Sequence, residues 1–237
     1  MLSEIFHQYS EHKNKELYWL TSDTKDLYLE NLKTNYDKLN QNGWIDRQFA
    51  YKFNSHGFRC DEFTNENSIM FLGCSFTCGI GLPLEDTWAY QVANSLNLKS
   101  VNLGIGGSGP DTAFRLANHY IPIIVPKIVV YLEPPLGRFS LVNDDKIYDF
   151  CVSNKSVDTR FKYFYEHWLS CEENLILDAR KHKLAIEMMC QQSRIKFEYK
   201  ELNEIGKDHL ARDLMHPGVS FNKTFANLVL NRINQNS

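Results

Sequence analysis

Short apolar runs alternate with longer amphipathic stretches over most of the chain after residue 67. Runs with the length of buried strands lie at 68–72, 100–103 and 128–132, and a further candidate lies at 194–199. Apolar residues recur at helical spacing in four longer stretches, 86–98, 111–121, 171–191 and 220–233. This alternation of strand and helix predicts an α/β fold, with a parallel sheet and helices on both of its faces.

The rest of the chain shows weaker patterns. Residues 1–65 are polar and rich in aromatic residues, with too few apolar residues for a core of their own. Within them, 24–39 has the spacing of one helix. Residues 140–170 are predicted to be irregular, apart from an aromatic helix near 161–168. We therefore predict two parts: a helical and extended N-terminal lead-in, 1–65, packed on an α/β domain, 66–237.

Composition fits one domain with a substantial core, since 43% of the 237 residues are hydrophobic. The formal net charge is −3 and both signs are mixed along the chain, so no basic stripe indicates nucleic-acid binding. The longest candidate for a membrane span, 121–132, is broken by prolines and a lysine. The first residues lack a signal-peptide pattern, and the six cysteines lack zinc-like spacing. We predict a cytoplasmic protein with free thiols, of unspecified oligomeric state.

One serine stands where α/β proteins place their functional sites. The strand at 68–72 stops at Gly73, Ser75 follows two positions later, and Gly79 and Gly81 precede the next helix. A tight, glycine-flanked loop at the carboxyl end of a parallel strand presents one hydroxyl at the edge of the sheet. Such a serine can act as a nucleophile when a base reaches it.

A base and an acid stand just before the last predicted helix. Asp213 and His216 lie three positions apart, and Pro217 and Gly218 keep the helix from extending back through the histidine. Both side chains can then face one site from a loop. In that arrangement His216 would accept the serine proton, and Asp213 would orient the ring and stabilise the imidazolium.

These residues fall in three ordered blocks that resemble the SGNH (GDSL-type) hydrolase family. The family's first block, Gly-Asp-Ser-x-Thr-x-Gly-x-Gly, is similar to 73–81, with cysteine in place of the aspartate. Its Asn-x-Gly-x-x-Gly block is similar to 102–107, and its Asp-x-x-His-Pro block to 213–217. The resemblance implies a flavodoxin-like three-layer α/β/α sandwich. It also implies a serine hydrolase that cleaves a short acyl or O-acetyl-carbohydrate ester without a cofactor or metal.

The same resemblance assigns roles to individual residues. Ser75 would be the nucleophile that forms an acyl-enzyme, and His216 and Asp213 would complete the catalytic triad. The N–H groups of Ser75 and Gly107 would be two donors of the oxyanion hole. Asp208 is the alternative acid, but its spacing from His216 does not fit the family's block.

One block of the family is missing. The family's third oxyanion donor, an asparagine after the third strand, has no counterpart in 132–138. Losing one such donor costs roughly 100- to 1,000-fold in rate. Arg138 is the candidate substitute, because a guanidinium binds oxyanions well. Two alternatives stay open: an acyltransferase on the same triad, with a sugar hydroxyl in place of water, and a non-catalytic SGNH-fold module that binds a glycan or a protein, which is consistent with the missing block.

Two further patterns suggest other ligands. The loop 104–109 fits the dinucleotide fingerprint G-x-G-x-x-G between a strand and a helix, with Glu133 placed to bind a ribose. A proline directly after the third glycine argues against it. His209, Asp213 and His216 offer nitrogen and oxygen ligands for a metal, but no fourth ligand stands out. The favoured partner is therefore a small-molecule or carbohydrate ester.

Overall fold

The computed structural model describes residues 7–64, 67–143, 146–151, 159–201 and 209–235. At its centre is a four-stranded sheet in the order β4-β3-β5-β8, in which every pair of neighbours is parallel. In that order the strands span Lys99–Asn102, Ser68–Leu72, Ile128–Leu132 and Lys196–Lys200.

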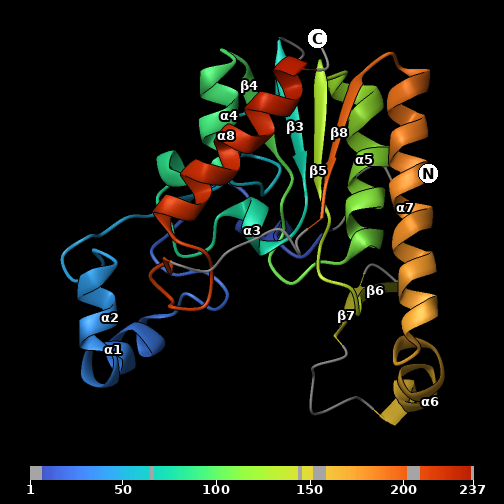
Figure 1. The fold of residues 1–237 in the computed structure, drawn as a ribbon. Helices are drawn as coiled ribbons and strands as arrows, with labels where there is room; N and C mark the ends of the chain where they lie inside the picture. The colour runs from blue at the N-terminus through green and yellow to red at the C-terminus, as the bar shows by residue number, and fades with distance from the viewer. Residues whose placement is uncertain (1–6, 65–66, 144–145, 152–158, 202–208, 236–237) are drawn as a thin grey trace.

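Four helices cover the two faces of this sheet (Figure 1). They are α4 (Trp88–Ser95) and α8 (Val219–Gln235) on one face, and α5 (Pro110–Ile124) and α7 (Glu172–Gln192) on the other. The first strand of the sheet lies between the second and the third, which is the strand order of flavodoxin-like folds. The predicted three-layer α/β/α sandwich with a parallel sheet is confirmed.

Both faces of the sheet are apolar because successive side chains of a strand point to opposite sides. In β3, Ile69 and Phe71 belong to the core cluster under α4 and α8, whereas Met70 and Leu72 belong to the cluster under α5 and α7. Every residue of β3 and of β5 is buried. The continuous apolar runs of the sequence are therefore strands covered on both faces.

The predicted helices are present, with ends shifted by a few residues. Helix α4 begins after Thr87, whose side chain caps the first turn. Helix α5 begins at Pro110, because proline suits the first helical position. The aromatic helix expected near 161–168 consists of α6 (Lys162–Phe164) and a π-helical segment, Tyr165–Leu169.

The single helix predicted at 24–39 is wrong, because the chain forms two helices there. They are α1 (Lys25–Thr34) and α2 (Tyr36–Gln41), and they are separated at Asn35. The backbone of Asn35 is not helical, with φ −135° and ψ 31°, and its side chain donates to Asn31. The spacing of apolar residues carries no sign of this change in backbone conformation at Asn35.

A β-hairpin occupies part of the region predicted to be irregular. Strand β6 (Arg138–Asn143) pairs in antiparallel register with β7 (Lys146–Cys151). Ser140 is buried, and its hydroxyl donates to the carboxylate of Asp149 on the opposite strand. A buried polar residue interrupts the apolar and polar alternation by which a strand is recognised. The prediction of irregular structure was therefore wrong for this segment.

The N-terminal part contacts the α/β part directly. It contains a small antiparallel pair, β1 (Glu16–Leu17) with β2 (Tyr51–Lys52). The buried indole of Trp44 donates to the carbonyl of Leu210, in the C-terminal loop, at 2.8 Å. The division of the chain near residue 65 stays a prediction.

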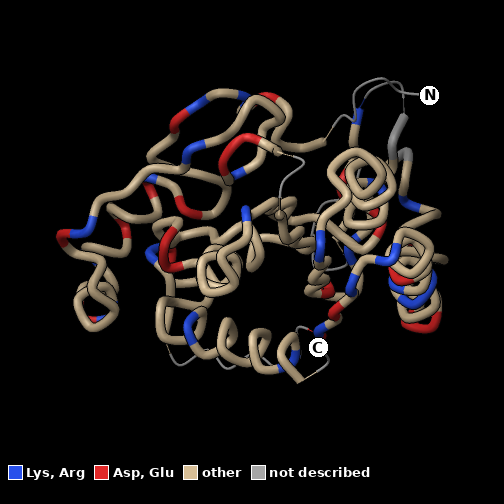
Figure 2. Tube along the Cα trace, turned by 90° about the horizontal axis from the view of Figure 1, so that it is seen from above, with Lys and Arg blue, Asp and Glu red and all other residues tan. Residues whose placement is uncertain are grey.

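The structure also bears on the cysteines, on membrane-spanning helices and on the distribution of charge. All six cysteines are free in the structure. Within the described ranges, no helix has both the length and the apolar character needed to cross a membrane. Figure 2 shows Lys and Arg interspersed with Asp and Glu along the trace, so both signs of charge are mixed over the described part of the chain.

Candidate active site

Ser75 stands at the carboxyl edge of the sheet, directly after β3. It is the first residue of the short helix α3 (Ser75–Cys78) and is 4% exposed. The loop that follows α3 packs on the C-terminal loop, where the carbonyl of Gly81 accepts the N–H of Arg212 at 3.0 Å. A Cβ on Gly81 would lie 2.7 Å from the Cβ of Ala211, and its φ of +78° favours glycine as well. The glycine thus lets the two loops meet.

The C-terminal loop brings Asp213 and His216 to the same place. Oδ1 of Asp213 accepts the N–H groups of Met215 and His216, both at 3.0 Å. A carboxylate that binds the backbone two and three residues ahead closes a tight turn. The N–H of Ala211 donates to the carbonyl of His216 at 2.8 Å and closes the base of the loop. The spacing of three positions therefore places the acid beside the imidazole.

Ser75, His216 and Asp213 form a continuous chain of hydrogen bonds. Nε2 of His216 lies 2.8 Å from Oγ of Ser75, and Nδ1 lies 2.6 Å from Oδ2 of Asp213. The Asp213 side chain is fully buried, whereas that of His216 is 15% exposed. The ring of Phe76 meets the imidazole edge to face. A hydroxyl, an imidazole and a carboxylate in this order can move the serine proton to the ring and stabilise the charge that results.

The carboxylate of Asp213 is held in its charged form. Burial raises the pKa of this group, but the hydrogen bond and charge of His216, together with the hydroxyl of Ser22, lower it below its ordinary value. The carboxylate therefore stays ionised at neutral pH, which is the form that orients and stabilises a histidine base.

The glycine-rich loop 104–109 lies against the serine loop. The N–H of Ile105 and the hydroxyl of Ser108 donate to the carbonyl of Gly73, at 3.2 and 3.3 Å. Gly107 is exposed, has φ +80°, and would place a Cβ within 4 Å of no other atom. No described residue accepts its N–H, so this donor is available to a ligand.

Asn102, at the end of β4, supports both loops. Its Nδ2 donates to the carbonyl of Thr77 in α3 at 2.8 Å. Its Oδ1 accepts the N–H of Gly104 at 3.0 Å. The asparagine of the second sequence block thus holds the serine helix and the glycine loop at a fixed separation.

Arg138 and Glu133 follow the neighbouring strand, β5. Arg138 begins β6, and its Nη1 is buried without a hydrogen-bond partner. Among the described residues, no hydrogen bond or ion pair joins it to Ser75 or Gly107. Glu133 accepts the hydroxyl of Tyr199 at 2.7 Å. The role of Arg138 as an oxyanion donor therefore stays a prediction.

The glycines of the loop 104–109 are explained by packing inside the protein. A Cβ on Gly104 would lie 2.5 Å from the nitrogen of Cys78, and one on Gly106 would lie 2.5 Å from the hydroxyl of Tyr9. Protein atoms therefore occupy the space that a side chain would need at both positions. The glycine pattern does not require a bound dinucleotide.

Two further predictions concern the metal site and the alternative acid, Asp208. Within the described ranges, no group of three or more His, Cys, Asp or Glu side chains could hold a metal ion. Nδ1 of His216 is bound to Asp213 instead. Asp208 lies outside the described residues.

A small recess adjoins the serine hydroxyl. Its volume is about 10 Å³, which accommodates roughly one water-sized group. Besides Ser75 and His216, its lining includes Phe76, Ile80, Leu82, Trp88, Leu132 and Phe221. The lining side chains are mainly apolar, so the recess suits a small apolar group.

Three residues of the N-terminal part contact the site, and none of them was predicted as a site residue. The hydroxyl of Ser22 donates to Oδ2 of Asp213 at 2.7 Å. The hydroxyl of Tyr9 accepts the N–H of Gly106 at 2.8 Å. The buried guanidinium of Arg59 donates to three carbonyls at and after the end of α3. No local pattern marks Ser22 or Tyr9 as site residues, because their partners lie 191 and 97 positions away along the chain.

Comparison with known proteins gives only distant likenesses. No family model matches the sequence, and no curated protein matches it. The structure is similar to that of a G-D-S-L family lipolytic protein from Desulfitobacterium hafniense DCB-2, with 12% identity over 70% of this chain and 99% of that one, and a TM-score of 0.36. It is also similar to a psychrotrophic esterase from Pseudoalteromonas sp., with 14% identity over 72% and 98% and a TM-score of 0.39.

An acetyl xylan esterase from Butyrivibrio proteoclasticus also matches, with 13% identity over 80% of this chain and 67% of that one, and a TM-score of 0.37. These solved structures are esterases and lipolytic proteins, the kind of protein that the sequence blocks resemble. With identities and TM-scores this low, the likenesses do not bear on the chemistry of this chain, which rests on its own contacts.

Proposed function

We propose that this protein hydrolyses an ester with a short acyl group, and that Ser75 is the nucleophile. The observation that carries the proposal is the chain of two hydrogen bonds from Ser75 through His216 to Asp213, at 2.8 and 2.6 Å. It joins a base to a serine at the carboxyl edge of β3, and it joins an ionised carboxylate to that base.

In the proposed reaction, Nε2 of His216 takes the proton of Ser75 while Oγ attacks the ester carbonyl carbon. The carbonyl oxygen becomes an oxyanion, which the N–H groups of Ser75 and Gly107 bind. His216 then gives its proton to the departing alcohol, and the acyl group stays on Ser75. Water attacks this acyl-enzyme with His216 again as base, which releases the acid and restores the serine.

The recess supports a small acyl group. At about 10 Å³ it accommodates roughly a water-sized group, so it suits a small acyl group such as acetyl better than a long chain. The alcohol part has no such limit if it leaves along the exposed side of His216. An acetylated small molecule or carbohydrate therefore fits the proposal.

The experiment combines covalent labelling with chain-length selectivity. A fluorophosphonate probe should label the wild-type protein and the Ser95→Ala variant equally, because Ser95 is an exposed residue at the end of α4. It should fail to label Ser75→Ala. 4-Nitrophenyl acetate should be hydrolysed at least ~10-fold faster than the octanoate, since pocket fit of a few methylenes gives selectivity of that order.

Equal labelling of the Ser75→Ala variant and the wild type would overturn the proposal. A wild type that is neither labelled nor hydrolytic would point to the non-catalytic binding module. Transfer of the acetyl group to an added sugar, in preference to water, would identify an acyltransferase on the same residues.

A further inference from the structure

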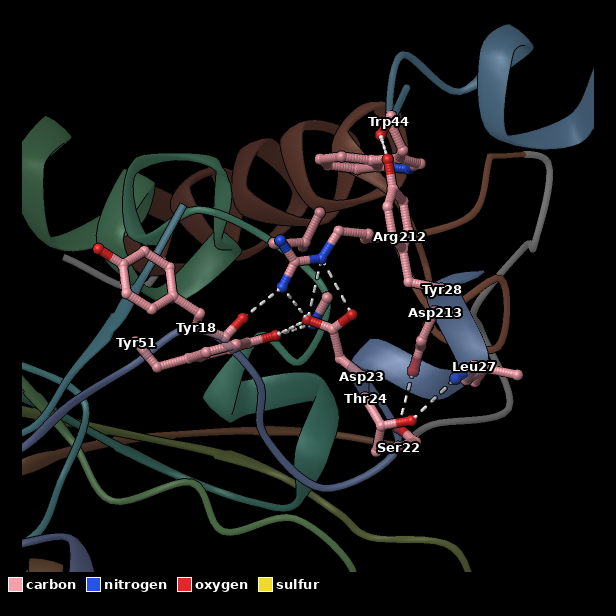
Figure 3. Close-up of polar contacts among 12 residues, drawn as sticks. Tyr18, Ser22, Asp23, Thr24, Leu27, Tyr28, Trp44, Tyr51, Arg212 and Asp213 are labelled. Carbon is pink, nitrogen blue, oxygen red and sulfur yellow. Dashed lines mark hydrogen bonds and ion pairs between the residues drawn. The ribbon is translucent and has the colours of Figure 1, made fainter. Parts of the chain in front are cut away.

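Two neighbouring residues of the N-terminal part bind two neighbouring residues of the C-terminal loop (Figure 3). Asp23 forms an ion pair with Arg212, and Ser22 donates to Asp213 at 2.7 Å. The ion pair has a closest distance of 2.6 Å, and both side chains are 1% exposed. Removing either partner would leave an uncompensated charge in the core. The ion pair therefore fixes which N-terminal residue stands opposite Asp213.

Both members of the ion pair are held by further contacts. The guanidinium of Arg212 lies over the rings of Trp19 and Phe49, 4.2 and 3.9 Å from their centroids. The hydroxyl of Tyr51 donates to Oδ2 of Asp23 at 2.5 Å. The ion pair between Asp23 and Arg212 thus holds the two segments together, and the adjacent residues Ser22 and Asp213 lie within hydrogen-bond distance.

Ser22 is presented by a tight turn. Backbone hydrogen bonds between Leu20 and Asp23, at 2.9 and 3.0 Å, close this turn. Oγ of Ser22 reaches the same oxygen, Oδ2 of Asp213, that faces Nδ1 of His216, and lies 3.5 Å from Nδ1 itself. Oδ1 is held separately by two backbone N–H groups. Among the described residues, Ser22 and His216 are the donors to Oδ2.

We propose that Ser22 is a positioning residue of this site, which holds the carboxylate of Asp213 against His216. The inference rests on the proposed function for its effect on rate. The Ser22 hydroxyl keeps Oδ2 in line with the imidazole, and it draws negative charge away from the side of the carboxylate that the ring meets. The N-terminal part then supplies a component of the active site as well as covering the core.

The test compares three variants in the full-length protein. Ser22→Ala removes the donor, Ser22→Thr keeps a hydroxyl, and Thr24→Ala is the matched control. Thr24 caps α1 through the N–H of Leu27 and does not contact Asp213, so its loss weakens the same segment without touching the triad.

For Ser22→Ala we expect kcat for 4-nitrophenyl acetate to fall about 10-fold with little change in KM, as for a lost hydrogen bond to a charged group. The acid limb of its kcat/KM profile should move to higher pH, because a carboxylate with fewer donors stabilises the imidazolium more strongly. Ser22→Thr and Thr24→Ala should keep the wild-type kcat and acid limb. A loss of rate in Ser22→Ala with an unmoved acid limb, or the same profile in Thr24→Ala, would overturn the inference.

A measurement independent of catalysis separates this inference from the proposed function. The ring of His216 is titrated by NMR in the wild type and in Ser22→Ala. A higher midpoint in the variant supports the coupling even if no ester is hydrolysed. An unchanged midpoint contradicts the coupling even if the wild type is an active esterase that is labelled on Ser75.

Discussion

β3 and β5 are adjacent parallel strands of five residues each, and their loops leave the same edge of the sheet. After β3, the polar groups that matter for chemistry are partnered: Ser75 binds His216, and His216 binds Asp213. After β5, Nη1 of Arg138 is buried without a hydrogen bond, as is Oη of Tyr131 within β5 and Oδ1 of Asp111 at the start of α5. On the β3 side, Oγ1 of Thr77 is likewise buried without a partner, but it lies outside the chain of contacts from Ser75 to Asp213.

The two loops also differ in the backbone donors they can offer. The glycine-rich loop beside the serine loop has an exposed glycine, Gly107, whose N–H no described residue accepts. The β5 loop continues from Glu133 into Pro134 and Pro135, which have no N–H to donate. Two strands with the same burial and direction thus lead into loops with different hydrogen-bonding groups, because the residues after each strand differ.

Of the substitutions that compare the two loops, Asp213→Asn should lower the rate most. An amide in place of the carboxylate removes the charge that stabilises the imidazolium, so kcat for an acetyl ester should fall by ~1,000- to 10,000-fold. Steady-state kinetics measures this, with Asp111→Asn near β5 as the matched control that should retain activity within about 10-fold. If both variants lose activity equally, the triad is not confined to the β3 side.

Arg138→Met should have a much smaller effect on rate. No described hydrogen bond links its guanidinium to Ser75 or Gly107, so kcat should change by less than about 10-fold. The same kinetic assay checks this. A fall of roughly 100-fold or more would instead identify Arg138 as the missing oxyanion donor. The loop after β5 would then also contribute a catalytic group.

Asp111→Asn should affect stability rather than rate. Burial raises the pKa of Asp111 from 3.8 to about 6, and Ser140 donates its N–H to Oδ2 at 2.9 Å. A raised pKa favours folding below pH ~4, where the group is protonated in both states, and that contribution is lost as pH rises through about 6. The wild type should therefore lose about 2–3 kcal/mol of unfolding free energy relative to the variant between pH 4 and 7.

Urea unfolding at the two pH values measures this difference. Asp26→Asn, at an exposed position in the first turn of α1, is the control and should show no such pH-dependent gain. If the difference in unfolding free energy between wild type and Asp111→Asn does not change with pH, ionisation of this buried carboxyl does not destabilise the fold, and the prediction is wrong.

The sheet and its helices were predictable because their signals are local. An apolar run such as 128–132 and an amphipathic stretch such as 171–191 each carry their pattern within one element. The hairpin at 138–151 was not predictable in this way, because Ser140 is satisfied by Asp149 on the opposite strand. The break at Asn35 was not predictable either, because apolar residues keep helical spacing through a residue whose backbone is not helical.

The sequence alone determined which residues could take part in the candidate site. Asp213 and His216 lie in one turn of four residues, so their spacing in the sequence already places them together. The glycines around Ser75 set the shape of its loop. Tertiary structure decided that the loops meet, which brings His216 within 2.8 Å of a serine 141 positions away. It also decided the position of Ser22, because the buried pair of Asp23 and Arg212 sets that register. Contacts between distant segments are fixed by packing of the whole chain, and no local pattern encodes them.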